Sequence, residues 1–169
     1  MAGADLLILH GSPGSGKTTL ARAVFELLRV ADRSVAVIDP DELNLVHPGR
    51  GNAFWLHNLE AIWPNYAATD DLRAIIPTVI ADAEVHRQLQ AALPAARFLV
   101  CELTAPIAIL KERVSAREPN EFWKQALERW VDVYHQRDAS QKFGDFEVST
   151  HDKSVDEAAA EVLDRAGWA

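Results

Sequence analysis

The sequence predicts an α/β fold in which helices cover both faces of a single parallel β-sheet. Two observations favour this class: short apolar runs alternate with amphipathic stretches of helical length, and they do so at the spacing typical of strand–helix–strand units. The 169 residues match the size of one ordinary domain, and no internal repeat, low-complexity segment or linker divides them. We therefore expect a single domain spanning residues 1–169.

Five apolar runs are the expected strands. Each is short, rich in Val, Ile, Leu or Phe, and bounded by polar or turn-forming residues. Pro77 has no N–H group to donate to a ladder, which argues against a long regular strand in the third run. In chain order the runs are residues 6–9, 34–38, 73–80, 97–101 and 146–149.

Five helices are expected between and after these runs. Leu20 and Val24 begin an apolar series at helical spacing in the first helix. Pro106 opens the third, while Ser154 and Glu157 form a capping-box pattern at the start of the last. The expected helices are residues 17–29, 83–93, 106–117, 120–136 and 154–167.

Composition and charge narrow the class of protein. The formal net charge of −8 disfavours nucleic acid as a partner, because neutralisation of phosphates dominates that kind of affinity. No apolar run approaches the roughly 20 residues that span a bilayer, and the N-terminus lacks a basic region and a cleavage site. We therefore expect a cytoplasmic protein without membrane contact. Cys101 is the only cysteine, so no intrachain disulfide is expected, and its apolar neighbours predict an inert core residue.

Residues 11–18, G-S-P-G-S-G-K-T, match the phosphate-binding pattern G-x-x-x-x-G-K-[ST] in full. The glycines allow a tight turn with inward-pointing backbone N–H groups, and the following helix adds the positive end of its dipole. Lys17 is expected on the β- and γ-phosphates and Thr18 on Mg²⁺. ATP with Mg²⁺ is the expected ligand, since the base-reading sequence N-K-x-D of GTPases is absent. The expected nucleotide-binding residues are Gly11, Ser12, Pro13, Gly14, Ser15, Gly16, Lys17, Thr18 and Thr19.

Carboxylates that follow the strands are the next candidates, because the ligand crevice of such a sheet lies at the carboxyl ends of its strands. Asp39 and Asp41 follow the second run as D-P-D, and Asp82 follows the third. Phosphoryl transfer to a hydroxyl needs a base for the nucleophile and carboxylates that hold Mg²⁺, directly or through water. We expect Asp39 to serve the metal and Asp41 the acceptor. The alternatives are that Asp41 only caps a helix beginning near Glu42, and that Asp82 is an ordinary surface residue.

The chain resembles the small P-loop kinases of the nucleoside-monophosphate-kinase-like group over nearly its whole length. The similar stretches are GSPGSGKTTL (residues 11–20), DPDEL (39–43) and LTAPIAILKERVSARE (103–118). The resemblance implies a three-layer α/β/α P-loop NTPase fold with a five-stranded parallel sheet in the order 2-3-1-4-5. It also implies a helical lid, at about residues 113–138, that two arginines open.

A narrower resemblance concerns residues 133–154, VYHQRDASQKFGDFEVSTHDKS, which are similar to the C-terminal stretch of chloramphenicol phosphotransferase-like proteins. In that family the last strand ends in Thr-His-Lys, whereas here Asp152 stands between His151 and Lys153. The aspartate that activates the acceptor hydroxyl in that family matches Asp41. Shikimate kinases and adenylylsulfate kinases also carry D-x-D there, so the motif indicates a reaction type and leaves the substrate open.

The two lid arginines are Arg113 and Arg117, four residues apart on one helical face. We expect both to stabilise charge on the transferring phosphoryl group when the lid closes. The alternative is that they form surface ion pairs with neighbouring glutamates. Arg129 and Arg137 are interpreted as either lid or surface residues.

The acceptor site is expected in a helical segment at about residues 44–71. Several aromatic rings with a few polar groups suit a pocket for a small organic molecule, although the same rings would also pack the segment onto the sheet. Trp123, Trp130 and Tyr134, at helical spacing further along, are expected to pack. The segment's rings and polar groups are Phe54, Trp55, Trp63, Tyr66, His47, His57 and Asn58.

These inferences predict an ATP- and Mg²⁺-dependent kinase that phosphorylates a hydroxyl group of a small molecule, either a metabolite or an antibiotic. Two alternatives stay open, a nucleoside or nucleotide kinase of the same fold and a nucleotide-binding protein without transfer activity. The only partner expected is the small-molecule acceptor, and both a monomer and a homodimer fit the sequence. The expected catalytic residues are Lys17, Asp41, Arg113 and Arg117, and the expected metal-associated residues are Thr18 and Asp39.

Overall fold

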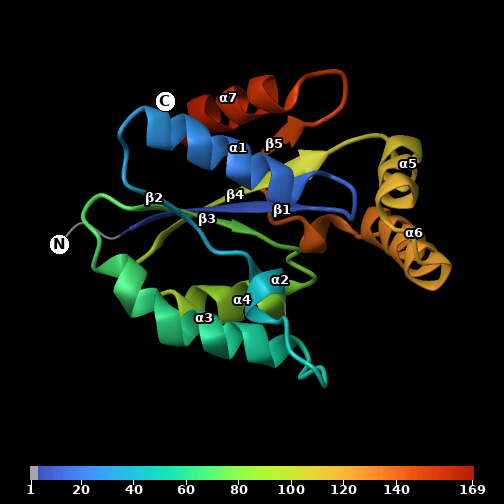
Figure 1. Cartoon of the computed structure of the whole chain (residues 1–169), viewed down its shortest axis with the longest axis horizontal. Coiled ribbons are helices and arrows are strands. Elements are labelled where there is room, and N and C mark those ends of the chain that lie inside the picture. The colour runs from blue at the N-terminus through green and yellow to red at the C-terminus, as the bar shows by residue number, and fades with distance from the viewer. Residues whose placement is uncertain (1–3) are drawn as a thin grey trace.

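The structure, a computed structural model, describes residues 4–169 and has the expected three layers (Figure 1). A five-stranded sheet forms the middle layer, with the strand order β2-β3-β1-β4-β5 and parallel pairing throughout. The predicted fold class and strand order are therefore confirmed. The strands are β1 (Asp5–Gly11), β2 (Val35–Val37), β3 (Arg73–Pro77), β4 (Arg97–Thr104) and β5 (Phe146–Ser149).

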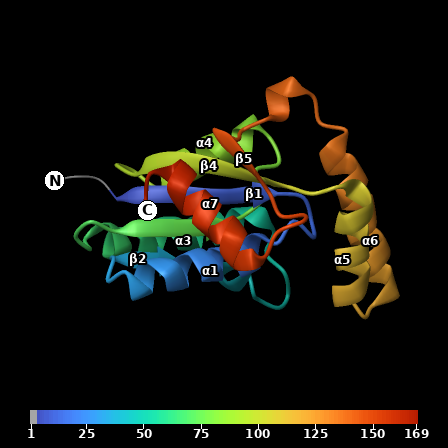
Figure 2. The same ribbon diagram turned by 90° about the horizontal axis from the view of Figure 1, so that it is seen from above.

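Helices α1 and α7 cover one face of the sheet, and α3 and α4 cover the other (Figure 1). Helices α5 and α6 form a hairpin beyond the carboxyl ends of the strands, where Figure 2 shows it standing apart from the sheet. A single 3-10 turn, Ala139–Gln141, follows the hairpin. The α-helices within the described residues are α1 (Lys17–Val30), α2 (Pro40–Leu43), α3 (Asn52–Ala67), α4 (Ala83–Ala92), α5 (Ile107–Arg117), α6 (Glu121–His135) and α7 (Val155–Ala166).

Strand β1 is buried on both faces, which explains its continuous apolar run. Leu7 and Leu9 pack into the core beneath α1 and α7, whereas Leu6 and Ile8 pack into the core beneath α3 and α4. Cys101 belongs to the first of these cores, and burial raises the pKa of its thiol to about 12. Among the described residues, no helix combines the length and the apolar character needed to cross a membrane.

Two strand boundaries differ from the expected ones. Strand β3 ends at Pro77 instead of residue 80, because the chain leaves the ladder there: the N–H of Ile80 donates to the His10 side chain, at 3.0 Å from Nδ1. Strand β4 continues to Thr104, three residues beyond the expected end at residue 101, and this extension carries Glu102 into the carboxyl edge of the sheet. The first difference brings the Ile80 N–H to His10 at the end of β1, and the second brings Glu102 to the same edge of the sheet. Both polar groups therefore lie where β1 meets the phosphate-binding loop.

Candidate active site

The loop between β1 and α1 has the conformation that a phosphate chain requires. Gly14 and Gly16 have φ angles of +79° and +89°, which residues with a Cβ adopt only under strain. Helix α1 begins directly afterwards, so its free N–H groups and the positive end of its dipole face the loop. The Lys17 ammonium group folds over the loop and donates to the carbonyl oxygens of Gly11 (2.9 Å) and Ser12 (3.0 Å).

Lys17 brings a buried positive charge to this loop. Burial lowers the pKa of Lys17 to about 8; the Asp41 and Asp39 carboxylates oppose this shift, and the Arg117 charge adds to it. A bound polyanion would stabilise the protonated lysine and raise the pKa again. The loop is therefore suited to a ligand with several negative charges.

Two serine hydroxyls of the loop support the same conclusion. Ser12 and Ser15 are buried, and their Oγ atoms have no hydrogen-bond partner among residues 4–169. A buried hydroxyl without a partner is costly, so native proteins rarely leave one unsatisfied. Unpaired hydroxyls fit a loop whose polar groups are satisfied by phosphate oxygens.

Thr18 and Asp39 form the pair expected to serve Mg²⁺. The Thr18 hydroxyl donates to Asp39 Oδ2 at 3.3 Å, while Asp39 Oδ1 accepts from the N–H of Asp41 at 3.0 Å and caps α2. In residues 4–169, no three His, Cys, Asp or Glu side chains gather as a metal site. A hydroxyl beside a carboxylate offers the hard oxygen ligands that Mg²⁺ prefers, and phosphates supply most of the rest in such sites.

Asp41 and Asp82 differ in what their side chains do. Asp39 is the cap of α2, so the alternative that Asp41 only caps a helix is wrong. Asp41 lies in the first turn of that helix, is exposed, and borders the larger of two cavities. Asp82 instead caps α4 by accepting from the N–H of Val85 at 2.9 Å. Of these two candidates, only Asp41 faces the cavity.

Two adjoining cavities meet at the phosphate-binding loop. The smaller has a volume of about 250 Å³ and lies between the loop, the start of α7 and the Thr150–Ser154 turn. The larger, about 710 Å³, extends from the loop past Asp41 toward α6. Gly14, Gly16 and Thr19 border both cavities. The arrangement offers one space for a nucleotide base and another for a second substrate, with the phosphate loop between them.

The structure separates Arg113 from Arg117. Arg113 borders the smaller cavity and donates to the Gly14 carbonyl (3.3 Å) and to the Thr150 hydroxyl and carbonyl (3.0 and 2.7 Å). It therefore links the phosphate loop to the turn after β5. Arg117 is exposed and borders the larger cavity. The spacing correctly indicated one helix, but the two guanidinium groups border different cavities.

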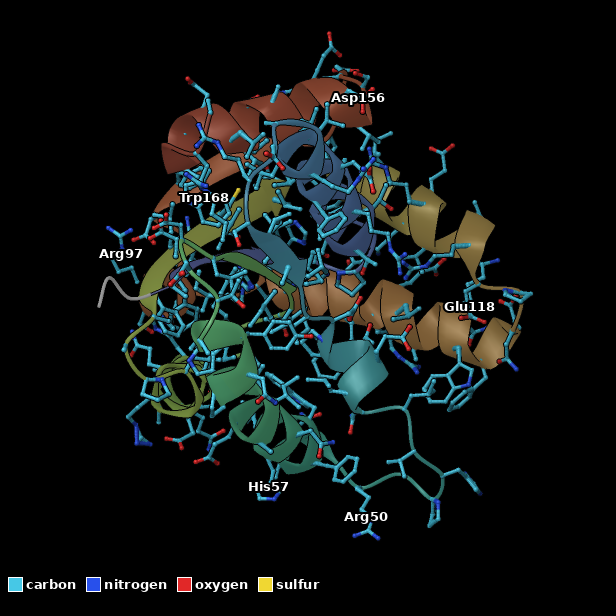
Figure 3. All side chains as sticks on the ribbon, turned by 60° about the vertical axis from the view of Figure 1, so that its left-hand side comes forward. Arg50, His57, Arg97, Glu118, Asp156 and Trp168 are labelled. Atoms are coloured by element: carbon cyan, nitrogen blue, oxygen red, sulfur yellow. The ribbon has the colours of Figure 1, made fainter. Side chains whose placement is uncertain are left out.

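The segment at residues 44–71 contributes less to the cavity than expected. Asn44, Asn52 and Trp55 border it. Trp63, by contrast, is buried in the core, where its Nε1 donates to the Pro94 carbonyl at 3.2 Å. Arg50 and His57 point away from the sheet toward solvent (Figure 3). Most of the segment's aromatic side chains therefore serve packing, as the alternative interpretation proposed.

The interpretation of the α6 tryptophans as packing residues is wrong. Trp123 and Trp130 are 57% and 61% exposed, and Trp130 borders the larger cavity together with Leu127 and Val133. Only Tyr134 of the three predicted packing residues is buried. The spacing correctly indicates one face of α6. That face borders a cavity, because α6 lies beyond the carboxyl ends of the strands and does not pack on the sheet.

A buried polar network lies behind the wall of the larger cavity, and sequence reasoning missed it. The N–H of Ile80 donates to His10 Nδ1 at 3.0 Å, and His10 Nε2 lies 3.1 Å from the Tyr134 oxygen and 2.9 Å from a terminal nitrogen of Arg137. The Tyr134 hydroxyl donates to Glu102 Oε1 at 2.7 Å, and Arg137 donates to the same oxygen at 2.8 Å. The Arg137 guanidinium also stacks on the Tyr134 ring, 3.4 Å from its centroid.

The network makes stability depend on pH through His10. Burial lowers the pKa of His10 from 6.5 to about 4; Glu102 opposes the shift, and Arg137 and Lys17 add to it. As the pH falls from 6.5 to 4, His10 binds a proton in the unfolded chain but stays neutral in the folded protein. We therefore expect the free energy of unfolding to fall across this window, by up to about 3 kcal/mol.

Urea unfolding at pH values across this window tests the expectation, with His10→Asn as the matched variant. Asparagine keeps an acceptor for the Ile80 N–H but has no titrating ring. We expect the variant to lose part of the wild-type decline in stability at low pH. An unchanged slope would show that His10 does not control this dependence.

The loop, the lysine and the hydroxyl–carboxylate pair at the carboxyl ends of a parallel sheet define a P-loop NTPase. The chain belongs to the AAA domain family, whose sequence profile matches residues 6–137. No curated protein matches the chain in sequence.

Solved structures share the whole fold. An APS kinase from Mycobacterium tuberculosis, in complex with AMPPNP and APS, is 23% identical with a TM-score of 0.65 over 97% of this chain and 98% of that one. A gluconokinase from Sinorhizobium meliloti is 14% identical with a TM-score of 0.65, over 97% and 91% of the chains. The Deinococcus radiodurans tunicamycin resistance protein is 18% identical with a TM-score of 0.64, over 98% and 97%. With the family match, these likenesses confirm the resemblance to small P-loop kinases.

Proposed function

We propose that the protein is an ATP- and Mg²⁺-dependent phosphotransferase that moves the γ-phosphate of ATP to a hydroxyl group of a small molecule. The observation that carries the proposal is the larger cavity, which Lys17 and Thr18 border from the start of α1 and Asp41 borders from α2. A phosphate held by Lys17 would then face an acceptor held beside Asp41.

The loop and its surroundings hold the donor. Backbone N–H groups of the loop and the Lys17 ammonium bind the phosphates, and the smaller cavity beside Thr150 receives the base. Arg113 fixes the distance between loop and turn through its bonds to Gly14 and Thr150. Thr18 and Asp39 hold Mg²⁺, which when bound neutralises charge on the phosphate oxygens.

Asp41 and Arg117 act on the transferring group. Asp41 borders the cavity without serving as the helix cap, so its carboxylate is available to accept the proton of the acceptor hydroxyl. Arg117, at the end of α5, lies near enough to Lys17 for its charge to lower the pKa of that lysine. Closure of the α5–α6 hairpin would bring this guanidinium to the equatorial oxygens of the phosphoryl group.

A nucleoside kinase is the second candidate. Trp130 borders the larger cavity, is 61% exposed, and presents aromatic surface on which a nucleobase could stack. This candidate shares the donor site and the role of Asp41. The two proposals differ only in the acceptor.

A panel of acceptors tests the proposal. Purified protein with ATP and Mg²⁺ is incubated with hydroxylated metabolites, antibiotics, nucleosides and nucleoside monophosphates, and ADP release is followed. We expect at least one acceptor to raise ADP release by tenfold or more, on the order of a 1.4 kcal/mol lower barrier. Lys17→Met should abolish the increase. Tight ATP binding with no acceptor-dependent release across the panel would instead indicate a nucleotide-binding protein without transfer activity.

A further inference from the structure

The acceptor side of the larger cavity is built from three segments that the phosphate loop does not include. They are α2 with the start of α3, the turn after β3 with the start of α4, and the second half of α6 with the residues that follow it. Most of their lining side chains are apolar, and the rest are mainly uncharged amides. The apolar ones include Trp55, Val79, Ile80, Leu127, Trp130 and Val133. A volume of about 710 Å³, shared with the phosphates, leaves room for a small organic molecule.

Four charged side chains border this cavity: Lys17, Asp41, Arg117 and Arg137. Lys17 lies on the phosphate loop, bonded to its carbonyl oxygens, and Arg117 lies on α5 one turn after Arg113, whose guanidinium donates to the loop's Gly14 carbonyl. Both cations therefore belong to the donor phosphates. On the acceptor side this leaves one cation, Arg137, and one anion, Asp41.

Arg137 is not available to an anionic ligand. Its Nε donates to the Tyr134 carbonyl at 2.8 Å, one terminal nitrogen donates to the Gln141 carbonyl at 3.1 Å, and the other donates to Glu102 at 2.8 Å. Its side chain is 11% exposed and that of Glu102 is 9% exposed, so the pair is neutralised inside the protein. Every guanidinium nitrogen thus has a protein partner, and the positive charge is balanced by a buried carboxylate.

An acceptor with a carboxylate, sulfate or phosphate group would therefore meet no free cation on this side of the cavity. It would lose hydration on entering an apolar space and would face the negative charge of Asp41. Proteins that bind such anions supply charge-assisted hydrogen bonds, most often from arginine. Arg137, the arginine on the acceptor side of this cavity, is already paired with Glu102.

We propose that the acceptor is an uncharged, hydroxylated molecule with a large apolar or aromatic face. The inference rests on the proposed function in one respect, that the larger cavity receives the acceptor. Trp130 contacts the apolar face, uncharged amides such as Asn52 and Gln136 bind its polar groups, and Asp41 faces the hydroxyl. Nucleoside monophosphates and hydroxy acids are excluded by charge, whereas a nucleoside is not.

Binding to matched pairs of compounds tests this proposal without requiring transfer. The members of each pair share a ring and at least one hydroxyl, and one member carries an anionic group that the other lacks: phenyllactate and the diol made by reducing its carboxylate, or uridine monophosphate and uridine. The protein is saturated with ADP and Mg²⁺, so that the phosphate loop is filled, and affinities are measured by calorimetry. We expect the uncharged member of each pair to bind at least about tenfold more tightly. Tighter binding of the anionic members would overturn the proposal.

The variant Glu102→Gln tests the reason for the preference. Glutamine keeps an oxygen that accepts from Tyr134 and Arg137 but removes the charge that neutralises the guanidinium. We expect the anionic member of each pair to gain about tenfold in affinity in this variant, with the uncharged member little changed. A preference identical to that of the wild type would show that the Arg137–Glu102 pair does not set it.

The proposed phosphotransfer activity and the proposed ligand class can be refuted separately. If ADP release with the same compounds stays at its acceptor-free rate while the uncharged members still bind better, phosphotransfer is wrong and the ligand class is right. If an anionic compound is both bound better and phosphorylated, phosphotransfer is right and the ligand class is wrong. Should Glu102→Gln fail to fold, the wild-type pairs alone decide the question.

Discussion

Replacing Asp41 with asparagine is expected to lower the rate of phosphoryl transfer by roughly a thousandfold, the contribution typical of a positioned general base. The amide is isosteric and keeps a polar group at the cavity wall, but it cannot accept the proton of the acceptor hydroxyl. ATP affinity should stay within about threefold of wild type, because the loop, Lys17 and the Thr18–Asp39 pair are untouched. Single-turnover transfer and equilibrium ATP binding measure the two quantities separately.

Glu42→Gln is the matched control for this experiment. Glu42 is the next residue in the first turn of α2, is exposed, and does not border the larger cavity. The same loss of charge there should leave transfer within about twofold of wild type. Equal losses in both variants would indicate a general effect of negative charge near the phosphates, and undiminished transfer by Asp41→Asn would remove Asp41 as the base.

Replacing Arg137 with methionine is expected to lower the free energy of unfolding by about 3–5 kcal/mol. The change leaves the Glu102 carboxylate buried without its guanidinium partner and removes the stacking on the Tyr134 ring. The carboxylate must then either stay charged without compensation or take up a proton, and both cost stability. Urea unfolding followed by circular dichroism measures the loss.

A double-mutant cycle separates charge from packing in this network. Glu102→Gln removes the stranded charge, so the double variant with Arg137→Met should be more stable than the sum of the two single losses predicts, by at least about 1 kcal/mol. Arg129→Met, at an exposed arginine of helix α6, should change stability by no more than about 0.5 kcal/mol. Strict additivity in the cycle would show that the two side chains do not stabilise each other.

The donor side of the site could be predicted from the sequence because its parts are contiguous. One loop and the first turn of one helix supply Gly11 through Thr19, and a short motif after the second strand supplies Asp39 and Asp41. Local rules of backbone conformation and capping act over a few residues. The same holds for the capping box at Ser154, which the structure contains with Gly167 ending α7 in the left-handed region.

The acceptor side could not be predicted, because its side chains meet only through the tertiary fold. His10 and Tyr134 are 124 positions apart, and Glu102 enters the network only because β4 runs three residues further than its apolar run. Periodicity identified the face of α6 that carries Trp130 but could not tell whether a sheet or a cavity lies opposite. The spacing of Arg113 and Arg117 likewise could not show that the loop's Gly14 carbonyl and the Thr150 turn engage one of them.

In the proposed reaction a phosphoryl group passes from ATP to an acceptor hydroxyl beside Asp41. Mass spectrometry of the acceptor, after incubation with ATP, Mg²⁺ and either wild-type protein or Asp41→Asn, tests it most directly. We expect wild-type protein to add one phosphate to a hydroxyl of an uncharged compound from the panel, and Asp41→Asn to add almost none while still binding ATP. Release of ADP and free phosphate with no phosphorylated acceptor, or equal product from both proteins, would contradict the claim.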